Sequence, residues 1–551
     1  MPAPSPLPAV LERFVREVRV EAARARETEA PALTLSLWRR FAESGDRLAY
    51  EAVYFERRRR LAALLLAAHL DERPDPALDA LLGSVCDEHT WILPAHAPDG
   101  DDPADRDRHV DLFAAETAHT LAEAVTLLGD RIAPAISARV RDEVDRRVLA
   151  PVQDRRWWWE TCAHNWAAVC AGATGMAALA LDSDRLPALL PRVEAALASY
   201  RSGAAPDGAC LEGPDYWAYG FGYFVYFAEA LRARTGRDLL DDPHVRAHVR
   251  AMAAYPAAID LGGGHRPAFA DATGHGTYPA GLLDRLAVRL DVPVPARPVD
   301  GPSFHDDPCY RWAHLSRTLW WTTGAARRPP APQAFLPHAG IVAARAAGSA
   351  FAAKGGHNDE PHNHLDLGHF VLYAGGEPIL DDLGAPEYTR DYFGPLRYRT
   401  PQAAADWHSV PLIDGAAQLP GRERAARVVA HVPGDPLLLA LDLTAAYGTP
   451  RLARLVRTFT WRPGRLDVAD AFAFHGGECR VEEMFVSRRR PVVGRGTVSW
   501  GPVTLRVPEP WRASPEELEV RGHDGRPETV HRVRLTASIP SGTCVFTFRL
   551  P

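Results

Sequence analysis

The hydrophobic pattern of this 551-residue chain changes its period once, and that change limits the possible folds more than any other feature. From about residue 7 to residue 320, apolar residues recur at intervals of three and four, as in residues 111–125 and 167–181, which is typical of helices. After residue 333 the apolar runs are short and often alternate, as in residues 455–461, which indicates strands. The first part is therefore predicted to be helical and the second part all-β.

A stretch rich in proline, alanine and arginine at residues 325–333 separates the two patterns. Since the chain is also longer than one hydrophobic core usually organises, we expect an α+β protein with a helical domain over residues 1–325 and an antiparallel β-domain over residues 334–551. Prolines and aspartates interrupt the helical pattern at intervals of roughly 20 to 40 residues, as expected of helical hairpins. An array of helix pairs curled into a toroid fits this half.

Composition excludes some classes of protein. The formal net charge of -7 argues against a nucleic-acid binder, which needs a basic face. No apolar run is long enough to span a bilayer, and the start of the chain lacks the basic and apolar regions of a signal peptide. The seven cysteines contain no CxxC spacing and are expected to be thiols. The expected location is the cytoplasm.

Histidines and carboxylates gather at residues 354–384, where four of the 22 histidines fall within thirteen residues. His362 and His364 are two apart, so an extended strand would point both imidazoles to one face. Asp382 ends a second strand after a Gly-Gly turn and can return alongside them. His408 precedes a further strand. These are ligand types that zinc prefers, so the stretch predicts a metal or catalytic site.

Aromatic and polar residues interrupt the helical half in one segment. Four of the ten residues 157–166 are tryptophans, which could stack on sugar rings or form a buried cluster. His164 and Asn165 form a polar pair at the start of an apolar helix, and such a pair must be hydrogen-bonded or functional. Both interpretations of the tryptophans stay open at this point.

A second segment begins at Glu212 and carries tyrosines at positions 216, 219 and 223, which share one helical face. Such a stripe usually belongs to a core, but the surrounding glycines indicate a backbone that approaches something closely. Another glycine-rich loop, residues 262–276, carries His265, Arg266 and Asp271 and could line the same cleft.

The helical first half, the all-β second half and the motifs at residues 164–172, 206–220, 356–384 and 388–418 together resemble the heparinase II/III-like polysaccharide lyases. Relatives in that superfamily act on heparan, alginate and other uronate polymers. The resemblance implies an incomplete (α/α) toroid followed by an antiparallel β-sandwich, with a cleft between them. It also implies a lyase that cleaves uronic-acid-containing glycans by β-elimination.

The resemblance assigns a role to each of several residues. Asn165, or the adjacent His164, would neutralise the uronate carboxylate. Tyr219, with Tyr216 as its rival, would protonate the leaving glycosidic oxygen. His362 would help to abstract the C5 proton.

The resemblance also implies a structural zinc ion held by His364, Asp382 and His408. Further contacts to the substrate are expected from Trp166, Glu212, Tyr216, Arg397, Arg399 and His265. The partner would be an acidic oligo- or polysaccharide, with neither nucleic acid nor membrane involved, and a homodimer is compatible with this reading. Without a signal peptide the enzyme would act on imported oligosaccharides, hence by an exolytic route. Lys354 is the only lysine, which favours an unsulfated uronate, alginate-like or glucuronate-containing.

Three other functions are weaker alternatives. The spacing of Gly356, His362 and His364 matches the start of a cupin metal motif. The glutamate that a cupin needs a few residues later is missing, so a metal-dependent dioxygenase or isomerase is less favoured. A non-catalytic carbohydrate-binding protein would keep the tryptophans. A glycoside hydrolase could pair two carboxyl groups from the set Glu88, Glu160 and Glu212.

Overall fold

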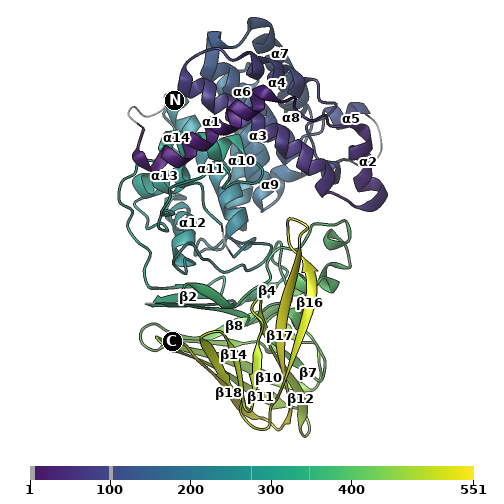
Figure 1. Cartoon of the computed structure of the whole chain (residues 1–551), viewed down its shortest axis with the longest axis vertical. Coiled ribbons are helices and arrows are strands. Elements are labelled where there is room, and N and C mark those ends of the chain that lie inside the picture. The colour runs from purple at the N-terminus through teal and green to yellow at the C-terminus, as the bar shows by residue number, and fades with distance from the viewer. Residues whose placement is uncertain (1–6, 99–102, 275, 347) are drawn as a thin grey trace.

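The computed structural model describes residues 7–98, 103–274, 276–346 and 348–551, and it divides into a helical part and a part built of β-sheets (Figure 1). Among the described residues, α-helices lie between residues 12 and 321 and strands lie between residues 333 and 549. The predicted fold class is therefore confirmed. Among the described helices, none has the length and apolar character that crossing a bilayer requires.

The helical domain is an incomplete toroid in which buried inner helices are surrounded by amphipathic outer ones. Helices α3, α6, α9, α11 and α14 are buried on almost every side over most of their length, as expected of an inner layer. The helices of the chain are α1 (Glu12–Glu27), α2 (Leu35–Ser44), α3 (Leu48–Asp71), α4 (Pro76–Cys86), α5 (Pro103–Asp107), α6 (Leu112–Leu128), α7 (Pro134–Val144), α8 (Ala150–Asp154), α9 (Asn165–Leu181), α10 (Leu186–Gly203), α11 (Pro214–Thr235), α12 (Arg246–Ala258), α13 (Ala280–Leu290) and α14 (Trp312–Trp321).

Two glycines are needed at α9 and α11: one lets the two helices pack closely, and the other immediately precedes α11. A Cβ at Gly172 would lie 2.9 Å from the carbonyl oxygen of Tyr223, so the glycine permits close contact between the two helices. Gly213 has φ 104° immediately before α11, and a Cβ there would lie 2.9 Å from the carbonyl oxygen of Phe269. Both helices begin beside the β-domain, which places their first residues at the domain interface.

The β-domain consists of three antiparallel sheets. The five-stranded sheet has the order β1 (Gln333–Leu336), β2 (Ile341–Ala346), β3 (Ser349–Ala353), β5 (Phe370–Ala374) and β6 (Glu377–Leu380). The nine-stranded sheet has the order β13 (Val492–Gly494), β14 (Thr497–Trp500), β15 (Val503–Arg506), β18 (Gly542–Arg549), β11 (Arg465–Phe474), β10 (Leu452–Arg462), β9 (Leu437–Asp442), β8 (Gly421–Val432) and β4 (Gly356–Asn358). The four-stranded sheet has the order β16 (Arg512–Arg521), β17 (Pro527–Ile539), β12 (Cys479–Ser487) and β7 (Pro411–Ile413).

The five-stranded sheet is buried on both faces and joins the two domains. Along β5, Phe370 and Leu372 belong to the core of the β-domain, whereas Val371 and Tyr373 belong to the core of the helical domain. The same alternation occurs in β2 and β3, because successive side chains of a strand point to opposite faces. The loops at the ends of these strands are therefore held against the toroid.

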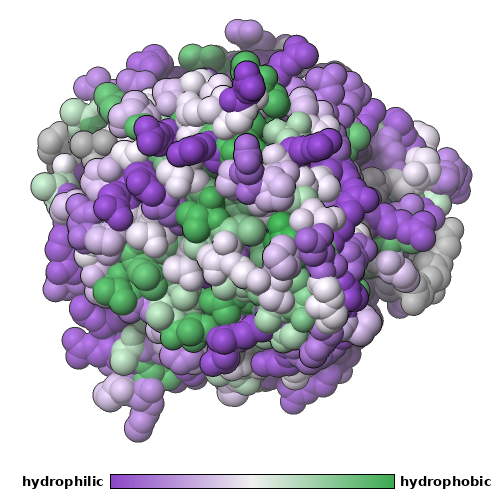
Figure 2. Space-filling model, turned by 90° about the horizontal axis from the view of Figure 1, so that it is seen from below, coloured by the Kyte–Doolittle hydropathy of each residue, from purple (hydrophilic) through white to green (hydrophobic). Residues whose placement is uncertain are grey.

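The outer end of the β-domain is a solvated surface, in contrast to the five-stranded sheet. Seen from below, its hydrophilic and hydrophobic residues are interspersed (Figure 2).

A buried ion network fixes the loops near the interface to the nine-stranded sheet. Arg457 in β10 donates two hydrogen bonds to Asp470 (2.9 and 2.7 Å) and one to Glu483 (2.7 Å), and all three side chains are inaccessible to solvent. It also donates to the carbonyl oxygens of Gly368 (3.1 Å) and Ser409 (2.7 Å). These two residues adjoin His369 and His408.

Replacing Arg457 by methionine should destabilise the β-domain by about 3 to 5 kcal/mol, because two buried carboxylates would lose their counter-charge. The measurement is the midpoint of urea unfolding monitored by tryptophan fluorescence. Arg454→Met is the control on the same strand, since Arg454 is exposed and its nearest carboxylate oxygen lies 3.8 Å away. Equal midpoints for the two variants would contradict a stabilising role for the network.

Candidate active site and metal centre

His362 lies between β4 and β5 at the interface of the two domains. Its backbone has φ 60°, a left-handed conformation that is costly for a residue other than glycine and that clusters at functional sites. Its Nδ1 is 2.7 Å from Oδ2 of Asp271, and as the donor of that hydrogen bond it leaves Nε2 with a free lone pair. Nε2 points toward Glu212, whose nearest oxygen is 4.0 Å away. His362 therefore has the arrangement of an oriented base.

Asp271, in a loop of the helical domain, binds side chains of the β-domain. It accepts hydrogen bonds from His362, from His364 (3.0 Å), from Arg397 (3.2 Å) and from the hydroxyl of Tyr392. Burial opposes its ionisation, but the hydrogen bonds from His362 and His364 hold the pKa of Asp271 well below its usual range. One buried carboxylate thus orients both the candidate base and a candidate metal ligand.

Asn165 begins α9 and is held in place by Glu212. Oε1 of Glu212 accepts from the backbone N–H of Asn165 (2.9 Å), and Oε2 accepts from its side-chain amide. Burial raises the pKa of Glu212. The amide nitrogen of Asn165 carries a second proton, and the side chain is buried, with no hydrogen-bond partner for its Oδ1 among the described residues. Glu212 therefore positions Asn165, and both side chains are buried. A direct contact between Glu212 and substrate stays a prediction.

His164 precedes Asn165 at the N-cap of α9 and is partly exposed. Burial, together with the nearby His362, lowers the pKa of His164 to about 4, so its imidazole is neutral near pH 7. His164 and Asn165, the two candidates for binding a substrate carboxylate, thus both lie beside His362. The geometry does not exclude either of them.

Tyr216 is the tyrosine that reaches this cluster. Its ring stacks on the imidazole of His362 with the centroids 4.2 Å apart, and its hydroxyl lies 2.7 Å from the hydroxyl of Tyr388. Burial raises the pKa of Tyr216 above its ordinary value, so the phenol stays protonated and can act as an acid.

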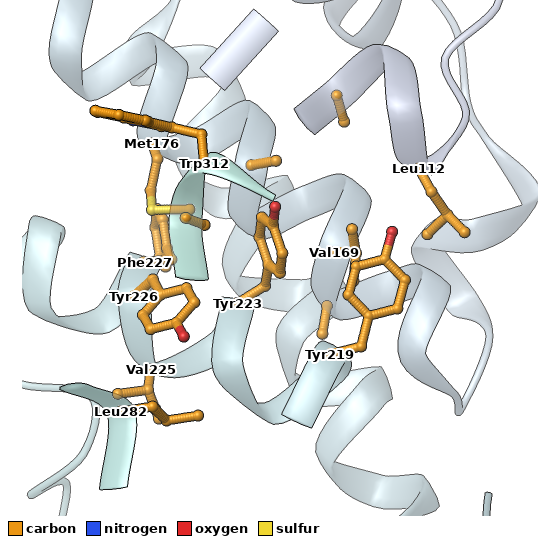
Figure 3. Close-up of a cluster of buried hydrophobic side chains, with 14 of the residues drawn as sticks. Leu112, Val169, Met176, Tyr219, Tyr223, Val225, Tyr226, Phe227, Leu282 and Trp312 are labelled. Carbon is orange, nitrogen blue, oxygen red and sulfur yellow. The ribbon is translucent and has the colours of Figure 1, made fainter. Parts of the chain in front are cut away.

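Tyr219 lies one turn further along α11, inside the core of the helical domain (Figure 3). It is 7% exposed, packs edge-on against Tyr223 (5.8 Å) and lies under the guanidinium of Arg311 (4.1 Å). The ring of Tyr219 is covered by core side chains, whereas the ring of Tyr216 stacks on His362. The geometry thus favours Tyr216 of the two, and the role of either as proton donor stays a prediction. The tyrosine stripe is a core feature at positions 219 and 223 and a site feature only at 216.

The tryptophans of residues 157–166 likewise divide into buried core residues and residues near the site. Trp157 and Trp159 are buried, whereas Trp158 is 54% exposed and Trp166 is partly buried beside it, with ring centroids 4.8 Å apart. Trp166 also contacts His96 (4.8 Å). The structure thus brings Trp166 to the rim of the cluster formed by His164 and Asn165.

Three other residues expected to bind substrate have different surroundings. His265 lies 2.9 Å from the carbonyl oxygen of Gly376 through its Nε2, a contact between the domains. Arg397 stacks over Tyr392 and pairs with Asp271, so its charge is compensated within the protein. Arg399 is exposed on the same short turn. His265 and Arg397 thus already have partners within the protein, and their direct contact with substrate stays a prediction.

His364, Asp382 and His408 meet in a buried cluster that fits a metal ion. His364 donates from Nε2 to Asp271, and His408 donates from Nδ1 to the carbonyl oxygen of Ala404 (2.8 Å), which leaves a lone pair on the other nitrogen of each ring. These two nitrogens and Oδ2 of Asp382 are buried and have no hydrogen-bond partner in the described part of the chain. Together with Asp366, the cluster's candidate ligand atoms lie within 4.8 Å of one another. A metal ion would satisfy lone pairs that are buried and unpartnered in this way.

His369 and Lys354 support this cluster without belonging to it. His369 accepts at Nδ1 from the backbone N–H of Ser409 (2.8 Å), so its Nε2 carries the proton and lies 3.4 Å from Oδ2 of Asp382. Burial lowers the pKa of His369 to about 3, which keeps it neutral. Lys354 donates to both oxygens of Asp366 (2.8 and 2.9 Å), so Asp366 is engaged already. His364, Asp382 and His408, the three ligands expected from the sequence, are thus the ones that remain available to a metal ion.

Sequence reasoning missed the organising roles of Asp271, Tyr388 and His369. Asp271 was noticed only as one polar residue of a glycine-rich loop, because its partners lie some 90 to 120 residues later in the chain. Tyr388 falls inside a motif segment, but nothing in its spacing signals a contact with Tyr216. His369 was counted among the four clustered histidines, and that density was the available signal.

Removing one ligand should abolish metal retention. We expect His408→Ala to reduce the metal-to-protein ratio to near zero after dialysis against a weak chelator, measured by atomic emission. His369→Gln should weaken retention by about 10- to 100-fold without abolishing it, as typical of an outer-shell partner. His357→Ala is the matched control, since His357 lies in β4 outside the cluster. Full metal content in His408→Ala would exclude this cluster as the metal site.

Comparisons with known proteins agree with this architecture. Residues 328–488 match the family model described as Heparinase II/III-like, C-terminal. No curated protein sequence matches the chain. The crystal structure of heparinase III superposes with a TM-score of 0.70 at 13% identity, covering 100% of this chain and 87% of that one.

Two further structures share the fold. The heparan sulfate lyase HepC from Pedobacter heparinus gives a TM-score of 0.60 at 13% identity, covering 96% of this chain and 87% of that one. The chondroitin AC lyase from Streptomyces coelicolor A3, in complex with chondroitin sulphate, gives 0.57 at 14% identity, covering 98% and 79%. These findings confirm the resemblance drawn from the sequence motifs: residues 328–488 are similar to the C-terminal domain of heparinase II/III-like proteins, and the chain shares the fold of the heparinase III structure.

Proposed function

We propose that the protein is a lyase that cleaves uronate-containing oligo- or polysaccharides by β-elimination. The observation that carries the proposal is the stacking of His362, oriented by Asp271, on Tyr216 beside Asn165 and Glu212. In this proposal His362 is the base, Tyr216 the acid and Asn165 the amide that binds the carboxylate, and their proximity between the two domains supports these roles. The similar folds of proteins named as heparan sulfate and chondroitin lyases support the same reaction class.

The proposed reaction uses the free nitrogen of His362 and the hydroxyl of Tyr216. Nε2 of His362 takes the proton from C5 of the uronate, and its electrons form the C4=C5 double bond as the bond from C4 to the glycosidic oxygen breaks. Tyr216 gives its proton to that leaving oxygen and can regain one from the hydroxyl of Tyr388, 2.7 Å away. Asp271 stabilises the imidazolium that forms, as an oriented carboxylate does in other histidine-base sites.

Removal of the C5 proton requires that the adjacent carboxylate accept further negative charge. In this proposal the second amide proton of Asn165 binds that carboxylate, with the N–H of neutral His164 beside it. Glu212 holds the amide in place through two hydrogen bonds, so little reorganisation is needed when charge develops.

The charges around the site favour a substrate with few sulfate groups. Two arginines close to the site residues already have carboxylate partners: Arg47 pairs with Glu51, and Arg397 pairs with Asp271. A heavily sulfated chain would need several uncompensated cations. We therefore infer an unsulfated uronate saccharide, and extend the proposal to exolytic attack on short chains.

We further propose zinc as the ion held by His364, Asp382 and His408, because two imidazoles and a carboxylate are its usual ligands. When bound, zinc would supply a fixed positive charge that orients these loops. His364 would then link the ion to Asp271, and through Asp271 to His362. Its proposed role is structural.

The alternative functions receive less support. Glu88 is bound by Arg57 and Arg58, and Glu160 is bound by Arg192, so neither is poised with Glu212 as a hydrolytic pair. A cupin takes its metal ligands from within one small barrel, whereas His364 lies between strands of two different sheets. A binding protein would have no need of the oriented base and acid.

Replacing Tyr216 by phenylalanine should reduce kcat by roughly 10²- to 10⁴-fold, as typical when a general acid is removed. The assay is the ultraviolet absorbance of the new double bond, which is conjugated to the carboxylate, on a panel of unsulfated and sulfated uronate oligosaccharides. Product size at early times reports whether attack is exolytic.

Tyr219→Phe is the matched control and should keep kcat within about threefold, because that ring lies in the core. A large loss in Tyr219→Phe with an active Tyr216→Phe would reverse the assignment. No absorbance on any uronate with the parent chain would exclude β-elimination and leave the binding or hydrolytic functions.

A further inference from the structure

Two exposed aromatic rings lie next to the candidate active site. Among the large hydrophobic side chains exposed in the described part of the chain, Trp158 (54%) and Phe393 (55%) are the aromatic ones, and the others are valine or leucine. Large aromatic side chains are usually kept substantially from water, and a ring that stays exposed beside a site is available for contact with a ligand.

Trp158 borders the helical side of the site. Its ring centroid is 6.0 Å from that of His164 and 4.8 Å from that of Trp166. Trp166 in turn contacts His96, whose Nε2 lies 3.5 Å from a guanidinium nitrogen of Arg47. These contacts form a continuous rim that begins at the residues proposed to bind the substrate carboxylate.

The turn that carries Trp158 is held rigidly. Glu160 accepts from the backbone N–H of Trp157 (2.8 Å) and pairs with Arg192, which fixes the 3₁₀ turn of residues 158–161. The neighbouring indoles are anchored inward, since Trp157 donates to the carbonyl oxygen of Pro151 and Trp159 donates to that of Val110. Trp158 alone of these three faces solvent. Its exposure therefore results from a well-packed turn.

Phe393 borders the site from the β-domain. It ends the 3₁₀ turn of residues 391–393, and its ring lies 4.9 Å from Tyr388 and 5.4 Å from Tyr392. Tyr392 is buried and donates to Asp271, so this turn is anchored on the same carboxylate as His362. Phe393 thus adjoins the pair formed by Tyr388 and Tyr216.

We propose that Trp158 and Phe393 are two sugar-stacking subsites, which hold pyranose rings adjoining the uronate that reacts. The C–H faces of a pyranose are apolar and cover an indole or phenyl ring well, while the sugar hydroxyls stay in water. Such contacts need no charge, which agrees with arginines that are compensated within the protein. The inference rests on the proposed function for the identity of the saccharide, and it adds a specificity for chains of at least three sugar residues.

Binding is measured by isothermal titration calorimetry on the Tyr216→Phe chain, which keeps the ring but should not cleave. The probes are an unsulfated chondroitin tetrasaccharide and a mannuronate tetrasaccharide. We expect Trp158→Ala and Phe393→Ala each to weaken binding of at least one probe by about three- to tenfold, the usual scale of one aromatic contact. Trp158→Phe should restore most of the loss. Val288→Ala, an exposed site on α13, should leave affinity unchanged.

In the cleaving chain, Trp158→Ala should raise KM for a tetrasaccharide and change kcat by less than about twofold, because stacking away from the reacting bond is equal in substrate and transition state. Affinities unaltered by both alanine substitutions, or a Tyr216→Phe chain that binds neither probe, would overturn the proposal. Absence of an ultraviolet product together with weakened binding in the alanine variants would instead refute β-elimination and leave the subsites standing.

Discussion

Asp271 brings a buried negative charge from the helical domain to the β-domain, and the arrangement of the site depends on its compensation. Leaving such a carboxylate unpaired away from water costs several kcal/mol. Four side chains of the β-domain supply the compensating hydrogen bonds, and two of them are the candidate base His362 and the candidate ligand His364. Docking of the domains and assembly of the site are therefore one event, since neither domain alone satisfies this group.

Hydrophobic packing between the domains fixes the position of Asp271 relative to its partners in the β-domain. The five-stranded sheet is shared by two cores, so it cannot tilt against the toroid without exposing Val371 or Tyr373. Arg457 ties the backbone next to His369 and His408 to the nine-stranded sheet. Apolar layers thus set the distance between the domains, and the buried ion pairs set the positions of the loops.

Most of the fold could be predicted from the sequence, because hydrophobic period is a local property that survives in the structure. The change from helix to strand near residue 325 needed only spacing and residue type. The same signals indicated a metal or catalytic site at His362, His364, Asp382 and His408, and the choice of the last three as ligands came from the family resemblance. The choice between Tyr216 and Tyr219 could not be made in this way. Both lie on one helical face, and only the position of the β-domain determines that Tyr216 meets His362 while Tyr219 stays in the core. Asp271 was hidden for the same reason, since its partners come from another domain.

Helices α9 and α11 both begin at the site, and the direction of these helices has a consequence for charge. The aligned peptide dipoles of a helix place roughly half an elementary positive charge at its N-terminus. Two long inner helices with their first turns at the interface, at Asn165 and Pro214, would thus create a positive potential from backbone groups alone. An anionic ligand would be attracted to such a place even though Arg47 and Arg397 already have carboxylate partners. The toroid would therefore contribute a positive electrostatic potential to the site as well as side chains that line it.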